Sequence, residues 1–189
     1  HTREILKKGG KVLGVDINEI SLQRAVGRIK EEDLEGGFKG VLGNFRNIDE
    51  IAEKHGFEKV SGILYDLGYS SYELEKGKLG LSFQKDEPLD MRLDSSLGVT
   101  AADLVNSLSE KELASLIYTY SDERLAKKFA KAIVNARSLE KIRTTNDLVK
   151  VIKSETSSNY ERGRINPATR TFQALRIVVN DELVNLEKS

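Results

Sequence analysis

The sequence contains no cysteine, carries no net charge and has no long apolar run. The absence of cysteine excludes disulfides, thiolate metal sites and a cysteine nucleophile, although it leaves the compartment open. Because 30 basic residues balance 30 acidic ones, any surface that binds nucleic acid must be local. No run approaches the roughly 20 apolar residues of a membrane span, and no signal peptide is visible. We expect a cytoplasmic protein with no membrane partner.

The first part of the chain, residues 1–76, predicts a parallel sheet with helices between its strands. Apolar runs at 11–16, 38–42 and 60–66 are typical of strands, and helical patterns occupy 19–32 and a shorter stretch near 49–55. This βαβαβ order predicts the first part of a doubly wound α/β sheet.

The second part, residues 77–175, predicts an all-helical insertion domain, and residues 176–189 predict a helix that returns to the sheet. Three helix starts carry capping boxes, formed by Thr100 with Asp103, Ser109 with Glu112, and Thr144 with Asp147. Pro167 opens the last predicted helix, whose apolar stripe extends to Leu183.

Two of the predicted strands end on an aspartate, at the edge of a parallel sheet where ligands bind. Asp16 is placed either to accept both ribose hydroxyls of a nucleoside or to cap the next helix. Phe45, beyond the second strand, either packs on an adenine or fills the core. Asp66 precedes the compact run Leu67-Gly68-Tyr69-Ser70-Ser71, and we favour a functional carboxylate that accepts hydrogen bonds from an amino group over a helix cap.

A cluster of basic residues has the spacing of one helical face. Its members are Arg124, Lys127, Lys128 and Lys131, at i, i+3, i+4 and i+7, and the positive charge continues at Arg137, Lys141 and Arg143. Such a run is either a solvated face or a phosphate-binding surface. Arg170, at the start of the last helix, suits a phosphate or a base edge. Neither histidine has the spacing of a metal ligand, so we expect no metal site.

Three segments together resemble the RsmH (MraW) family of methyltransferases. They are Asp66-Leu-Gly-Tyr-Ser-Ser71, Pro88-Leu-Asp-Met-Arg92 and Asn166-Pro-Ala-Thr-Arg-Thr-Phe-Gln-Ala-Leu-Arg176, and the resemblance covers essentially all 189 residues in order. It implies a Rossmann-like class I methyltransferase sheet with a helical insertion. It further implies S-adenosyl-L-methionine as the cofactor and N4 of a cytosine in the decoding region of small-subunit ribosomal RNA as the target, within the assembled subunit.

The resemblance also implies roles for individual residues. Asp16 becomes the ribose ligand, Phe45 an adenosine contact, and Asp66 a cofactor contact beside the target base and the candidate catalytic residue. His1 matches the end of the family's glycine-rich cofactor loop. Glu73 stands where the family commonly has glutamine, which keeps an acceptor but removes the amide donor. The basic cluster and Arg170 become RNA contacts.

The family's glycine-rich loop and its later strands have no counterpart here, so we expect a fragment with an incomplete sheet. We expect such a fragment to bind the cofactor weakly and to be inactive alone. Two alternatives stay open, a nicotinamide-dependent dehydrogenase and a non-catalytic RNA-binding or ribosome-assembly module. A DNA amino-methyltransferase is disfavoured because the run after Asp66 lacks the proline usual in that class. The oligomeric state is also open, a dimer included.

Overall fold

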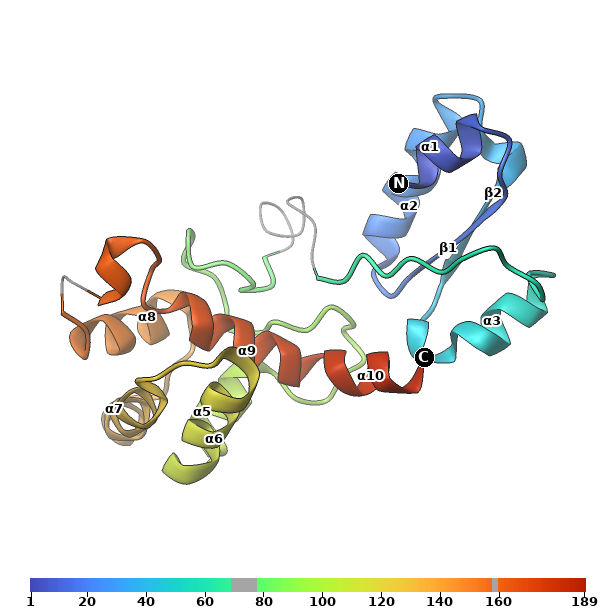
Figure 1. The fold of residues 1–189 in the computed structure, drawn as a ribbon. Coiled ribbons are helices and arrows are strands. Elements are labelled where there is room, and N and C mark those ends of the chain that lie inside the picture. Colours follow the sequence, from blue (N-terminus) through green and yellow to red (C-terminus); the bar gives the residue numbers. More distant parts are fainter. Residues whose placement is uncertain (69–77, 158–159) are drawn as a thin grey trace. The chain divides into compact units, whose positions relative to one another are not determined.

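The computed structural model describes residues 1–68, 78–157 and 160–189, which Figure 1 draws as a coloured ribbon. The chain divides into two compact units. We name residues 1–68 with 182–189 the sheet unit, and residues 69–181 the helical unit. The fold is mixed α/β, as the sequence predicts, because a parallel pair of strands in the first unit accompanies many helices.

A parallel pair of strands lies at the centre of the sheet unit. Strand β1 (Val12–Asp16) pairs with β2 (Phe38–Leu42), and helix α2 (Glu19–Lys30) connects them and packs against both. These three elements confirm the predicted start of a doubly wound sheet. The register sets Asp16 opposite Leu42, so both strands end at the same edge.

The other elements of the sheet unit are short. They are α1 (Thr2–Lys7), η1 (Glu35–Gly37), η2 (Phe45–Asn47), α3 (Ile48–Lys54) and α10 (Glu182–Lys188). Among the apolar side chains described in this unit, only Leu6 and Ile29 are buried. The sheet unit therefore has a small core.

The predicted third strand is wrong. Residues 60–66 form no strand, and residues 60–68 are all exposed. Ile63 and Leu64 leave 60% and 62% of their surfaces accessible. A strand needs a hydrogen-bonded neighbour, and among the described residues β1 and β2 pair only with each other. The apolar pattern of this segment is real, but the partner that would turn it into a strand is absent from the described part of the chain.

The described residues of the helical unit form five longer helices. They are α5 (Ala101–Ser107), α6 (Glu110–Ser121), α7 (Ala126–Leu139), α8 (Thr145–Ser154) and α9 (Thr169–Val179), with the short η3 (Tyr160–Gly163) before α9. The three predicted capping boxes are all formed, at the starts of α5, α6 and α8. None of the helices in the described ranges has the length and apolar character needed to cross a membrane.

The prediction of one last helix, opened by Pro167 and carrying an apolar stripe to Leu183, is wrong in its extent. Helix α9 ends at Val179, and α10 begins as a separate helix at Glu182. Asp181 between them has a φ of 49°, a left-handed conformation that interrupts the α-helix. The apolar spacing alone does not reveal this break.

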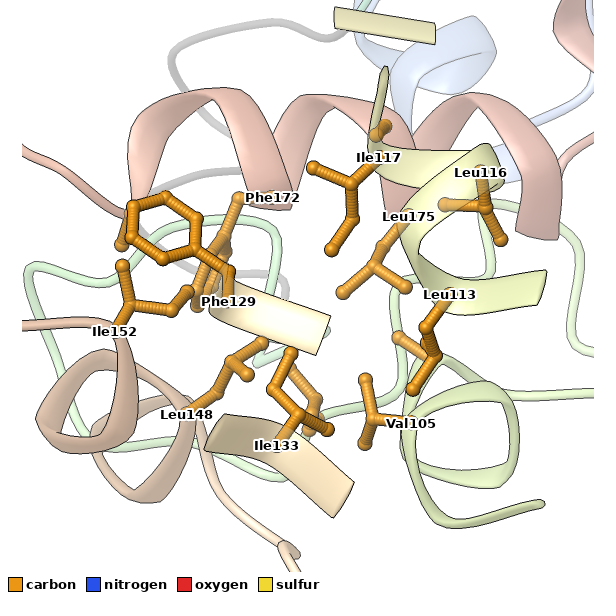
Figure 2. Packing of buried hydrophobic residues seen from close by; sticks show 14 of the residues in the cluster. Val105, Leu113, Leu116, Ile117, Phe129, Ile133, Leu148, Ile152, Phe172 and Leu175 are labelled. Carbon is orange, nitrogen blue, oxygen red and sulfur yellow. The ribbon is translucent and has the colours of Figure 1, made fainter. Parts of the chain in front are cut away.

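The core of the helical unit is formed by apolar faces of all five longer helices. Figure 2 shows the side chains meeting between them. The labelled ones are Val105 of α5, Leu113, Leu116 and Ile117 of α6, Phe129 and Ile133 of α7, Leu148 and Ile152 of α8, and Phe172 and Leu175 of α9. This core holds the polar elements of the unit at fixed positions.

The Pro88–Arg92 segment is fastened to this core although it has no regular structure. Leu89 and Met91 are buried, and the Leu89 N–H donates to the carbonyl oxygen of Arg143 at 2.9 Å. The guanidinium of Arg92 donates to both carboxylate oxygens of Asp90, at 2.7 Å from Nε and 2.9 Å from Nη2. The charged side chains of this motif therefore bind each other within the loop.

Candidate functional site

The carboxyl edge of the strand pair holds the first candidate residue, Asp16. Its side chain is half-buried at the end of β1, and Oδ1 accepts the backbone N–H of Asn18 at 2.8 Å. Asn18 in turn is the N-cap of α2, since its side chain accepts the N–H groups of Ile20 and Ser21. The cap of this helix is therefore Asn18, while Asp16 forms the turn that precedes it. A carboxylate so fixed at a sheet edge is suited to accept hydroxyl groups.

Phe45 lies just beyond the end of β2, in η2. Asn44 starts this turn by accepting the N–H of Arg46 at 3.0 Å. The ring is half-buried and meets the ring of Tyr65 edge to face, with centroids 5.9 Å apart. Tyr65 was not a candidate from the sequence, and its only signal there is an aromatic residue beside Asp66.

His1 and Asp66 lie together although they are separated by most of the sheet unit's sequence. Their Nδ1 and Oδ2 atoms are 3.6 Å apart, and their side chains are 68% and 83% exposed. Tyr65 contacts Phe45 and directly precedes Asp66, and Asp66 lies beside His1. These contacts link three of the predicted cofactor residues, His1, Phe45 and Asp66. Glu73 lies outside the described residues.

The predicted RNA-binding residues of the helical unit differ in their surroundings. Arg124 is exposed in the turn before α7, so the prediction that it lies on one helical face with the three lysines is wrong. The helix starts only at Ala126 because Asp122, at the end of α6, takes a left-handed φ of 52°. Lys127 and Lys131 are exposed on α7.

Two other basic residues of α7 already have partners. Lys128 donates from Nζ to the carbonyl oxygen of Glu155 at 2.7 Å and lies 3.4 Å from its carboxylate. Arg137 donates from Nη1 to the carbonyl oxygen of Val105 at 2.7 Å, so it ties α7 to α5. The basic character of this helix is therefore partly structural.

Arg170 occupies the first turn of α9 and pairs with an acid that the sequence analysis missed. Its Nη1 lies 3.7 Å from Oε2 of Glu123, whose side chain is only 1% exposed. The hydroxyl of Tyr160 donates to the same oxygen. Burial, together with this hydrogen bond to Glu123, raises the pKa of Tyr160 to about 12, so the phenol stays protonated as a donor.

These contacts bring separate motifs to one end of the helical unit. Glu123 directly precedes Arg124 and reaches Arg170, while Lys128 of the next helix reaches the end of α8. We name Arg124, Lys127, Lys128 and Arg170 the cationic end. Through Glu123, Arg170 is joined to the turn that carries Arg124, more than 40 positions earlier in the sequence.

Comparison with known proteins shows what the chain is similar to. The sequence profile described as the MraW methylase family matches residues 1–189. Over its whole length the chain is 41% identical to the ribosomal RNA small subunit methyltransferase H of Sulfurihydrogenibium azorense, of which it covers 64%. It is 41% and 43% identical to the proteins of the same name from Paramagnetospirillum magneticum and Geotalea uraniireducens, and it covers 58% and 61% of them. The chain thus spans about three fifths of the length of these relatives.

Proposed function

The chain belongs to the MraW methylase family, and from this premise we propose that it methylates N4 of a cytidine in the decoding region of small-subunit ribosomal RNA. The observation that carries the proposal is the position of Asp16 at the carboxyl end of β1 and of Phe45 just past that of β2, where nucleotide-like cofactors bind. The relatives' names specify ribosomal RNA of the small subunit. We propose the assembled small subunit, in the cytoplasm, as the substrate.

The donor set of the sheet unit fits S-adenosyl-L-methionine. Asp16 offers a carboxylate held by a turn, which would accept the two ribose hydroxyls, and the half-buried Phe45 ring offers an apolar contact for adenine. His1 and Asp66 would complete the contacts of this unit. When bound, the cofactor supplies an electrophilic methyl group on a sulfonium.

Asp66 is the candidate catalytic residue because it combines a carboxylate with a position beside the aromatic pair. The amino nitrogen of cytosine is a weak nucleophile, since its lone pair is delocalised into the ring. A carboxylate that accepts an N–H hydrogen bond favours charge build-up on this nitrogen and aligns it with the methyl group. The proton that leaves the nitrogen passes to Asp66 or to water.

The helical unit would hold the RNA. A base must leave its stack to enter a methyltransferase site, and single-stranded regions allow this most easily. Arg124, Lys127, Lys131 and Arg170 would neutralise flanking phosphates, and Lys128 would contribute less because Glu155 already holds it.

Mass spectrometry of small-subunit ribosomal RNA tests the proposal in cells that carry or lack the gene. We expect one N4-methylated cytidine in the decoding region to disappear with the gene. Restoring the gene with Asp66→Ala should leave the site unmethylated, whereas Asp49→Ala on the exposed face of α3 should restore it. Unchanged methylation without the gene would refute the enzyme. RNA binding by the chain would then favour the assembly module.

A further inference from the structure

Among the described residues of the helical unit, Glu123 is the charged residue whose side chain is buried. It lies between α6 and α7, and its Oε1 accepts the N–H of Leu125 at 2.8 Å. Its Oε2 accepts the hydroxyl of Tyr160 and lies 3.7 Å from Nη1 of Arg170. Removing a carboxylate from water is costly unless such partners compensate. These contacts together hold the Glu123 carboxylate in one position.

Stability alone is a weak reason for this arrangement. A buried ion pair often contributes no more than apolar residues of the same volume would, because desolvation offsets the attraction. What the pair does supply is orientation. A guanidinium is a planar fork with five N–H donors, and a fixed carboxylate 3.7 Å from one of its nitrogens restrains where that fork can lie. Arg170 nevertheless keeps 27% of its side chain exposed.

The surroundings of Arg170 favour an anionic partner. Arg124 is the residue after Glu123, and Lys127 follows within one turn of the start of α7. Glu155, at the end of α8, is already bound to Lys128. The N-terminus of α9 adds the positive end of a helix dipole beside Arg170.

We propose that Glu123 is a positioning residue that orients Arg170 toward a phosphate of the bound RNA. The hydroxyl of Tyr160 donates to the same carboxylate oxygen and so helps to hold it in place. This inference rests on the proposed RNA substrate, and it assigns the buried acid a role in binding rather than in folding alone.

A double-mutant cycle on RNA affinity tests the inference. Fluorescence anisotropy would measure a labelled hairpin of the decoding-region RNA with the whole chain, for the unmodified protein, Glu123→Gln, Arg170→Gln and the double variant. We expect Arg170→Gln to weaken binding roughly tenfold, as loss of a charge-assisted hydrogen bond does. Glu123→Gln should weaken it several-fold, but should add nothing once Arg170 is gone. Equal effects of Glu123→Gln in both backgrounds would overturn the proposal.

Arg170→Lys keeps the inference testable if Glu123→Gln fails to fold. It preserves the charge but removes the planar fork, so we expect it to bind RNA nearly as weakly as Arg170→Gln. Affinity close to that of the unmodified chain would mean that charge alone matters and that no positioning occurs. Absence of RNA binding by the unmodified chain would instead refute the RNA part of the proposed function, and the inference with it.

Discussion

The side-chain amide of Asn180 donates to the carbonyl oxygen of Met91 at 2.8 Å, and its Oδ1 accepts the N–H of Leu93 at 2.8 Å. Met91 is fully buried and has a φ of 65°, which is strained for a residue with a side chain. Asn180, the C-cap of α9, therefore holds the strained turn of the Pro88–Arg92 segment in place.

Asn180→Ala should lower the free energy of unfolding of the helical unit by about 1–3 kcal/mol, because it leaves two backbone groups of the turn without partners. Urea denaturation followed by circular dichroism would measure the change. Gln173→Ala on the exposed side of the same helix is the matched control and should be nearly neutral. Equal stability of the two variants would show that the amide does not hold the turn.

The ion pair between Asp90 and Arg92 leads us to expect that the free energy of unfolding depends on pH. The hydrogen bonds from the Arg92 side chain lower the pKa of Asp90, against an opposing effect of burial, and the Arg92 N–H lowers it further. A lowered pKa contributes stability that is complete above the unfolded value of about 3.9, and that is lost as pH falls through the folded value. Asp90→Asn should therefore flatten the acid side of a stability–pH curve. A curve that keeps its full slope in this variant would contradict the assignment.

The local signals of this sequence are reliable because they depend on neighbouring residues alone. Each predicted capping box is formed, since the Ser or Thr and the acid three residues later need only each other. The strand predicted at residues 60–66 fails for the opposite reason, because a strand depends on a partner elsewhere in the chain. The break at Asp181 also escapes the pattern, since apolar spacing continues through it.

The capping box of α6 can be tested against a serine of the same helix. Ser109→Ala removes the acceptor for the Glu112 N–H and should cost about 1 kcal/mol of stability. Ser115→Ala, on the exposed middle of α6, should be neutral or slightly stabilising because alanine is the better helix former. Thermal unfolding of both variants measures the contrast. The prediction fails if Ser109→Ala melts at the temperature of Ser115→Ala.

Asp16→Asn separates the two roles of this residue. Asparagine keeps an oxygen that accepts the Asn18 N–H, so the turn and the melting temperature should be preserved. The substitution also replaces one carboxylate oxygen with an N–H donor, so the side chain can no longer accept both ribose hydroxyls. We therefore expect methylation in complemented cells to drop by about tenfold or more. Full methylation with this variant would leave Asp16 with a structural role only.

The candidate site was only partly predictable from sequence. Asp16, Phe45 and Asp66 stand out because they follow apolar runs, and this placement needs no tertiary information. Glu123 does not stand out, since it lies in a charged stretch where an acid is usually exposed. Its burial follows from the packing of α6 against α7 and α9, and from Tyr160 and Arg170, which lie far along the chain.

We expect Lys127 and Lys131 to contribute to the salt dependence of RNA binding. Both are exposed, and within the described residues neither has a hydrogen bond or an ion pair, so each is available to a phosphate. Each replacement by glutamine should reduce the slope of log affinity against log salt concentration by about 0.7, the value for one single-stranded phosphate contact. Lys111→Gln is a charge-matched control, because Lys111 lies in the first turn of α6, about 15 Å along the helix axis from Ser121, where α6 ends before the turn to α7. A slope that falls equally for all three variants would mean that RNA responds to total charge rather than to this surface.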